Sequence, residues 1–280
     1  MESKVARALG LRYEPVAILW EDERPGGALG FKPGRFGCVM SLFAAVAQTG
    51  RVAAFDRETY GCWGGGVGLG FGNAYRAFPG GEACFSRFLS SGNATWETGQ
   101  AQAEALKDSM GKEFAENFLK GEGYLRGPEQ VMAFIQSLPI REIPARYVVF
   151  APLKDLDGGV RTQKKVVTFL VNPDQLAALV VLAHRAKETP GEAVAAPWAA
   201  GCQSISILSY YEAERENPRA ILGLVDISAR SHVRKLGADI LSLSVPFSMF
   251  LAMEDALEGS FVERSTWKSL LSKKEEAGRL

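Results

Sequence analysis

Residues 166–185 read VVTFLVNPDQLAALVVLAHR, and this stretch decides the type of fold. Residues 166–171 form a run rich in β-branched side chains, apolar except for Thr168, which is typical of a buried strand. Asn172 and Pro173 then mark a helix start, because Asn is a favoured N-cap residue and Pro is tolerated in the first turn. The apolar residues that follow predict a helix to about Lys187. A strand that leads directly into a helix is therefore expected here.

Further strands and helices are expected on both sides of this stretch. Apolar runs predict strands at residues 15–20, 51–55, 147–150, 220–227 and 239–243. Helical patterns cover residues 2–10, 38–47, 96–119, 127–138, 202–215 and 247–257. Strands and helices mix without strict alternation, so the sequence predicts an α+β (mixed α/β) fold.

An internal echo links the two halves of the chain. Gly37-Cys38 and Gly201-Cys202 each precede an apolar helix, a loop and a short strand. Counting 24 residues onward reaches Cys62 in the first copy and Asp226 in the second, both at the end of a strand-like run. We expect two degenerate half-domains, residues 1–140 and 141–280, built around one core and forming one compact unit.

Composition limits the kind of function. The 280 residues are 47% hydrophobic and 23% charged, which is ordinary for a globular protein. Lys and Arg together number 32, as do Asp and Glu, and this balance argues against a nucleic-acid partner. The chain has no apolar run that would span a membrane, and residues 1–10 do not resemble a secretory signal. A cytoplasmic protein is expected, with reduced cysteines.

The segment GCWGGGVGLGFG, residues 61–72, is the most unusual in the chain. Seven of its twelve residues are glycine, although glycine is costly to order. The spacing excludes the dinucleotide fingerprint, and no Lys-Ser or Lys-Thr pair completes a phosphate-binding loop. We expect a loop whose backbone N–H groups, at Gly64 and Gly65 among others, form a collar around a ligand or a sulfur atom.

The four cysteines are the main candidates for chemistry. Cys38 and Cys202 follow glycine at predicted helix starts, and Cys62 lies in the glycine segment, whereas Cys84 has apolar neighbours. A helix N-terminus lowers a thiol pKa and favours the metal-binding thiolate. Without a C-x-x-C pair, zinc-ribbon and ferredoxin signatures are absent. We expect Cys38, Cys62 and Cys202, with Cys84 as a fourth candidate, to hold an iron–sulfur cluster or another metal.

Two other functions fit the same residues. The first is a non-redox domain that binds an anionic or aromatic small molecule with the glycine segment, Trp63, Trp198 and an arginine, Arg76 or Arg230. The second is a thiol-dependent enzyme with Cys62 or Cys38 as nucleophile. His232, near a strand end, is a further ligand candidate. The expected partner is a small molecule or a redox protein.

A family resemblance runs through most of these segments. Residues 15–18, Cys38 before an alanine-rich helix, and Cys62 with Gly64-Gly65 and residues 68–70 resemble the DUF169 family. Residues 167–176, Gly201-Cys202, residues 228–230 and Val245-Pro246 resemble its second half. The resemblance implies a family of unknown function found mainly in archaea and anaerobic bacteria. It therefore implies an anaerobic cytoplasm, where iron–sulfur chemistry is common, and no particular reaction.

Overall fold

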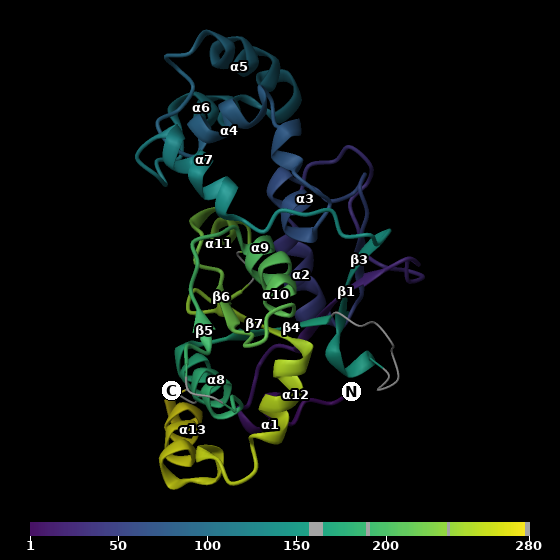
Figure 1. Cartoon of the computed structure of the whole chain (residues 1–280), viewed down its shortest axis with the longest axis vertical. Helices are drawn as coiled ribbons and strands as arrows, with labels where there is room; N and C mark the ends of the chain where they lie inside the picture. The colour runs from purple at the N-terminus through teal and green to yellow at the C-terminus, as the bar shows by residue number, and fades with distance from the viewer. Residues whose placement is uncertain (157–164, 189–190, 234–235, 278–280) are drawn as a thin grey trace. The chain divides into compact units, whose positions relative to one another are not determined.

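A mixed β-sheet with helices on both faces forms the larger of two compact units, so the fold is α+β (Figure 1). The computed structural model describes residues 1–156, 165–188, 191–233 and 236–277. One unit comprises residues 1–69 and 144–280, and the other comprises residues 70–143. The expected halves, 1–140 and 141–280, do not coincide with these two units.

The sheet unit contains the following elements in chain order: α1 (Lys4–Ala8), β1 (Val16–Glu21), α2 (Val39–Thr49), β2 (Ala53–Phe55), α3 (Trp63–Leu69), β3 (Tyr147–Pro152), η2 (Leu153–Asp155), β4 (Lys165–Val171), α8 (Pro173–Arg185), β5 (Val194–Ala195), α9 (Gly201–Ile205), α10 (Ile207–Glu212), β6 (Ala220–Gly223), α11 (Ile227–His232), β7 (Leu241–Pro246), α12 (Phe247–Asp255), η3 (Phe261–Glu263) and α13 (Ser265–Ala277). The other unit contains η1 (Ala74–Ala77), α4 (Gly81–Phe88), α5 (Glu97–Met110), α6 (Lys112–Lys120) and α7 (Pro128–Ser137).

The strand that opened the sequence argument, β4, lies at the centre of the sheet. The strand order is β2-β3-β1-β4-β7-β6-β5, with antiparallel pairing except between β5 and β6. Helix α8 follows β4 as expected. The Asn172 side chain accepts from the Gln175 amide at 3.0 Å, and the Gln175 side chain accepts in return from the Asn172 amide at 3.1 Å. This reciprocal capping box explains why the helix begins at that residue.

The first six strands of the sheet are arranged symmetrically about its centre. Strands β1 and β4 are central neighbours, β3 and β7 lie outside them, and β2 and β6 come next. The register agrees. Val16, which begins β1, pairs with Pro152 at the end of β3, while Val166 of β4 pairs with Pro246 at the end of β7. The two halves of the sheet are therefore related by a pseudo-twofold axis between β1 and β4, and the first half includes β3, beyond residue 140.

Alternate strand residues face two different layers of helices. Ala17 and Leu19 of β1 belong to a core that also contains residues of α1, α8 and α12. On the opposite face, the ring of Trp20 contacts Tyr210 of α10 with centroids 4.6 Å apart. Figure 1 shows α12 and α8 on one side of the sheet and α2, α9 and α10 on the other. The second layer is the one that carries three of the four cysteines.

Residues 70–143 fold around a cluster of aromatic side chains in stacked and edge-to-face contact. Phe78 lies 5.1 Å from Phe85 and 5.9 Å from Phe118 between ring centroids. The single helix expected over residues 96–119 is instead two helices, α5 and α6. Gly111 between them has φ +92°, a backbone conformation that disfavours other residues and ends α5. The apolar stripe continues across this break, which is why the sequence pattern did not reveal it.

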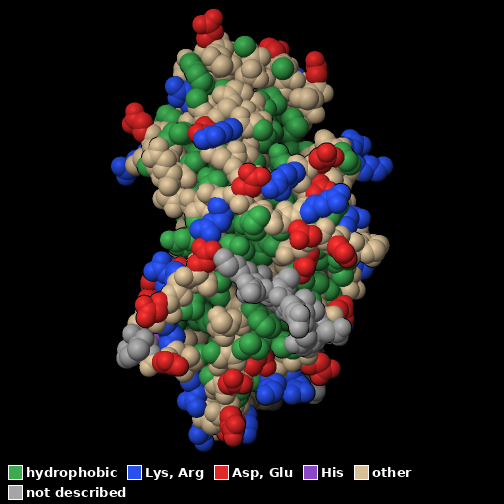
Figure 2. Space-filling model, turned by 45° about the vertical axis from the view of Figure 1, so that its right-hand side comes forward, with side chains coloured by type: hydrophobic (Ala, Val, Ile, Leu, Met, Phe, Trp, Pro, Cys, Tyr) green, Lys and Arg blue, Asp and Glu red, His purple; other side chains and the backbone are tan. Residues whose placement is uncertain are grey.

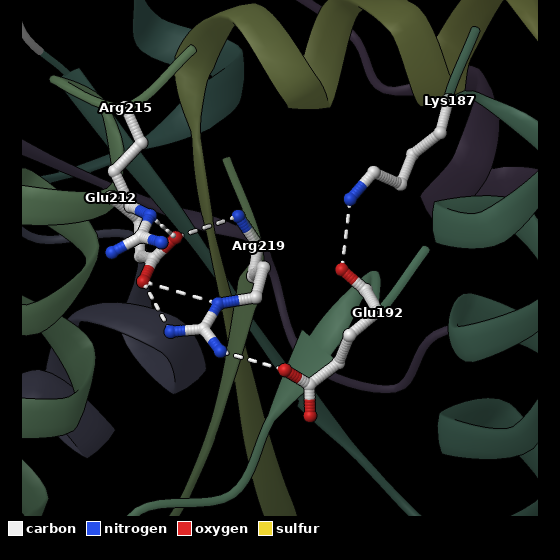
Figure 3. A network of polar contacts seen from close by, with 5 residues as sticks. All are labelled: Lys187, Glu192, Glu212, Arg215 and Arg219. Atoms are coloured by element: carbon white, nitrogen blue, oxygen red, sulfur yellow. Dashed lines mark hydrogen bonds and ion pairs between the residues drawn. The ribbon is translucent and has the colours of Figure 1, made fainter. Parts of the chain in front are cut away.

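A polar network joins α10 to the beginning of β6 (Figure 3). The Glu212 side chain is only 4% exposed and accepts from the backbone N–H of Arg219 at 2.9 Å and from its guanidinium at 2.8 Å. Arg219 also donates to Glu192 at 2.7 Å, and Lys187 donates to the Glu192 carbonyl at 2.8 Å. The buried carboxylate is thus paired, as a buried charge must be, and it fixes α10 against the sheet.

The surface carries both signs of charge. Over the face drawn in Figure 2, acidic and basic side chains are interspersed with apolar ones. None of the described helices is both long enough and apolar enough to cross a membrane.

Candidate functional site: a three-cysteine cluster

The glycine segment, expected to be a loop, forms the helix α3 over most of its length. The correction has a packing cause. A Cβ on Gly68 would lie 2.7 Å from the backbone carbon of Cys202, and a Cβ on Gly65 would lie 2.4 Å from the carbonyl oxygen of Tyr60. Only glycine permits such approaches. The contacts with α9 thus override the poor helix propensity of the segment.

Cys62 and Cys202 lie at opposite edges of one peptide group. The Gly65 N–H donates to the Cys62 sulfur at 3.3 Å, so the thiol occupies the N-cap position of α3. The Cys202 thiol donates to the Gly64 carbonyl at 3.1 Å. Because Gly64 and Gly65 share this peptide, and its oxygen and nitrogen are about 2.3 Å apart, the two sulfur atoms lie within roughly 9 Å of each other.

The segment that carries Cys38 packs against both of the others. A Cβ on Gly61 would lie 2.4 Å from the Gly37 carbonyl oxygen, so the residues just before Cys38 and Cys62 are in contact. On the other side, a Cβ on Gly201 would lie 3.0 Å from the Met40 side chain in α2. Each of the three cysteines follows a glycine whose missing side chain makes room for a neighbouring segment. We call Cys38, Cys62 and Cys202 the three-cysteine cluster.

Desolvation of the sulfur atoms keeps these thiols protonated, although Cys38 and Cys62 are only half-buried as whole residues. It raises the pKa of Cys62 to about 12, against the opposing effect of the Gly65 amide. Burial also raises the pKa of Cys38, and it raises that of Cys202 well above the ordinary value. Helix N-termini were expected to lower these pKa values. That expectation is wrong, because desolvation raises the pKa values by more than the N–H donors lower them.

The thiols would also repel one another if they ionised. After burial, the next causes that raise the pKa of Cys202 are the charges of Cys62, Cys38 and Asp226. Such mutual influence requires short separations in a medium of low dielectric constant. The three thiols and the Asp226 carboxylate therefore form one electrostatically coupled group.

Asp226 is the residue of this group that sequence reasoning did not assign to it. Its Oδ1 accepts from the Ala229 amide at 2.6 Å and caps α11. Burial raises the pKa of its carboxyl, while the amides of Ala229 and Gly201 lower it. The 24-residue spacing that relates Cys62 to Asp226 was the available signal.

The helix contacts at the site repeat across the pseudo-twofold axis. Ser206, four residues after Cys202, donates to the Gly68 carbonyl at 2.5 Å. Ser41, three residues after Cys38, donates to the His232 carbonyl at 3.3 Å. Gly68 and His232 are each six residues beyond the equivalent pair, Cys62 and Asp226. Each cysteine-bearing helix thus holds the second helix of the other half.

The remaining candidates belong to the other unit or have contacts of their own. Cys84 belongs to α4 in the other unit, where burial raises its pKa and Arg87 lowers it. Arg76, in that unit too, forms an exposed ion pair with Glu82 at 3.7 Å. Trp198 is 36% exposed. Trp63 begins α3, and its ring lies 5.7 Å from that of Phe36.

Arg230 and His232 of α11 bond to the backbone. Arg230 donates to the carbonyls of Leu224 at 3.1 Å, Ile240 at 2.9 Å, and Ala238. Its guanidinium therefore holds the turn before Asp226 rather than reaching for an anion. The exposed His232 ring has Nδ1 2.7 Å from the Ser228 carbonyl.

The residues of the three-cysteine cluster do not match a single-ion site, but their donor atoms match those of an iron–sulfur cluster. In the part of the chain that the structure describes, no group of three or more His, Cys, Asp and Glu side chains is arranged to hold a single ion. The donor set itself is suitable, because thiolates are the ligands of iron–sulfur clusters. A second feature also fits, since Asp226 Oδ2 is buried and no described donor meets hydrogen-bond geometry with it.

Comparison with known proteins supplies a family and no reaction. No curated protein and no solved structure matches the chain. The model of the DUF169 family, described as "Uncharacterised ArCR", matches residues 4–256. This match covers both pseudo-symmetric halves of the sheet and the whole three-cysteine cluster. The chain belongs to the DUF169 family.

Proposed function

We propose that the protein binds an iron–sulfur cluster through Cys38, Cys62 and Cys202 and serves in the redox or cofactor chemistry of an anaerobic cytoplasm. The observation that carries the proposal is the placement of two thiols at the edges of the Gly64–Gly65 peptide, with the Cys38 segment packed against both. A bound cluster would supply one-electron transfer or a Lewis-acidic iron. Its expected partner is a redox protein or a small-molecule ligand.

A cluster suits this spacing better than a single ion does. A tetrahedral ion with metal–sulfur bonds of about 2.3 Å needs its thiolates roughly 3.8 Å apart. In a cluster each cysteine binds a different iron atom, so the sulfur atoms stand farther apart. The Gly64–Gly65 peptide between Cys62 and Cys202 keeps these two sulfur atoms separated, and its N–H already donates to one of them. Donors of this kind adjust the properties of a bound cluster.

The chemistry of the protonated thiols also agrees with metal binding. Metal displaces the thiol proton, and the positive charge of the metal offsets the desolvation that raises the pKa. A nucleophilic cysteine instead needs a lowered pKa and access to solvent. The Cys38 and Cys62 thiols have raised pKa values, so the thiol-dependent enzyme is not favoured.

The small-molecule alternative also lacks support at these residues. The Arg230 guanidinium donates to backbone carbonyls. A surface hollow of about 470 Å³ in the sheet unit is lined by Asp22, Asp56, Arg57, Glu58 and residues 144–147. This lining includes neither Trp63 nor Arg230.

The direct test is purification without oxygen, followed by the visible absorption spectrum and assays of iron and acid-labile sulfide. We expect a coloured protein with several irons per chain. Cys38→Ser, Cys62→Ser and Cys202→Ser should each lose most of the iron. Cys84→Ser is the matched control, since this buried cysteine belongs to the other unit, and it should keep the wild-type iron content. A colourless, iron-free wild type after reconstitution with iron and sulfide would refute the proposal.

A further inference from the structure

Asp226 occupies the position in the second half of the sheet that Cys62 occupies in the first. Each residue follows the equivalent cysteine by 24 positions, Cys38 in one half and Cys202 in the other. Each also lies at the N-cap of a short helix after an equivalent strand, β2 or β6, and accepts a hydrogen bond from the amide three residues on. The pseudo-twofold axis therefore relates a carboxylate to a thiol that belongs to the three-cysteine cluster.

The two oxygens of Asp226 have different surroundings. Oδ1 caps α11 through the Ala229 amide. Oδ2 is buried, and no described donor meets hydrogen-bond geometry with it, although the nearby Gly201 amide helps to lower the pKa of the carboxyl. A Cβ on Gly201 would lie 3.2 Å from Oδ2, so this oxygen lies beside the residue that precedes Cys202. A buried acceptor without a well-formed hydrogen bond costs free energy, and a bound cation would reduce that cost.

The turn that presents Asp226 is held in a strained conformation. Leu224, two residues earlier, has φ +56° and is the one non-glycine residue with positive φ in the described chain. Arg230 holds this conformation by donating to the Leu224 carbonyl at 3.1 Å. Strained backbone of this kind persists where surrounding contacts enforce it, and it often occurs at functional sites. The carboxylate is thus positioned before any ligand arrives.

We propose that Asp226 is the fourth protein ligand of the site and that it binds one iron through Oδ2, which gives a three-thiolate, one-carboxylate set. This inference rests on the proposed iron–sulfur function. The iron held by the carboxylate is the exchangeable one, because oxygen binds iron–sulfur clusters less firmly than thiolate does. His232 is the other candidate nearby, but its ring is exposed and its Nδ1 faces the Ser228 carbonyl.

The test compares wild type, Asp226→Asn and Asp226→Cys after anaerobic reconstitution, with iron per chain and the rate of iron loss to a chelator as readouts. Asn keeps the N-cap but removes the charged ligand. We expect Asp226→Asn to lose one iron at least about ten-fold faster than wild type. Asp226→Cys completes a four-thiolate set and should lose iron more slowly than wild type. Asp22→Asn, a change at an exposed carboxylate, is the control and should match wild type.

The outcomes separate the two proposals. If wild type holds iron and both Asp226 variants lose it at the wild-type rate, Asp226 is not a ligand and the three-cysteine proposal stands. An iron-free wild type overturns both. Should Asp226→Asn fail to fold, judged by far-ultraviolet circular dichroism, the Asp226→Cys comparison still decides, since equal or faster iron loss from that variant contradicts the inference.

Discussion

Replacing Gly68 by alanine tests the close contact between α3 and α9. The added methyl carbon would lie 2.7 Å from the backbone carbon of Cys202, 2.8 Å from its oxygen and 2.9 Å from the Gln203 nitrogen. These are backbone atoms of a packed helix, so they cannot rotate away as a side chain would. Overpacking typically costs about 1–3 kcal/mol. Against this, alanine gains about 1 kcal/mol of helix propensity over glycine.

The same helix offers a matched control at Gly64. A Cβ there would lie 3.8 Å from the Cys202 sulfur and 3.9 Å from Ala200, which is ordinary contact. Gly64→Ala should therefore stabilise the protein by about 0.5–1 kcal/mol through helix propensity alone. Because a clash with backbone atoms falls at the upper end of the overpacking range, Gly68→Ala should destabilise it by about 2 kcal/mol net.

Urea unfolding followed by circular dichroism measures both changes. We expect the transition midpoint to fall for Gly68→Ala and to rise for Gly64→Ala, with the slope of the free energy against urea unchanged. In thermal unfolding, a loss of about 2 kcal/mol lowers the midpoint by roughly 4–8 °C for a unit of this size. Equal stability of Gly68→Ala and Gly64→Ala would refute the packing explanation of the glycines.

Three further predictions concern other parts of the sheet unit. Arg219→Met leaves the buried Glu212 carboxylate with weaker pairing and should lower the stability by about 3 kcal/mol in urea unfolding. Lys187→Met, whose contact with Glu192 in the same network is exposed, is the control and should change the stability by less than about 0.5 kcal/mol. The raised pKa of Cys62 means that the folded apo-protein binds more protons than the unfolded chain above about pH 8.5, so the stability should fall as the pH rises from there toward 12. Below that range the stability should not depend on this thiol. Cys62→Ser should flatten the decline, and an unchanged slope of stability against pH would contradict the raised pKa of Cys62. Arg230→Ala removes donors to three carbonyls around Asp226 and should speed amide hydrogen exchange in residues 224–232 at least several-fold, which Arg76→Ala, a change in the other unit, should not do.

The sequence predicted the sheet elements well because their signals are local. The run at 166–171, the cap at Asn172 and the helix after it appear as β4 and α8. The glycine segment was assigned wrongly because propensity describes an isolated chain, and the reason for its helix is a neighbour 138 residues away, as the contact between Cys202 and Gly64 shows. Likewise, a glycine at positive φ divides residues 96–119 without interrupting their apolar stripe.

The candidate site was partly accessible from sequence. The residue types and their Gly-Cys setting singled out Cys38, Cys62 and Cys202, whose segments pack together in the fold, while the assignment of Cys84 to the other unit required the structure. The direction of the thiol pKa shifts was missed, because the number of N–H donors can be guessed from a helix start but the depth of burial cannot. The only sequence signal for Asp226 was the 24-residue spacing that it shares with Cys62. That spacing could be interpreted as internal symmetry only once the strand order was known.

The pseudo-twofold axis has a consequence for how such a site can evolve. In a homodimer of two identical halves, every substitution near the axis appears twice, so the residues of a site there can change only in matched pairs. Here one covalent chain carries both halves, and Cys62 and Asp226 already differ although they occupy equivalent positions. A single chain thus allows each of these residues to vary alone, and it also allows residues 70–143 to follow α3 in one half without a counterpart in the other.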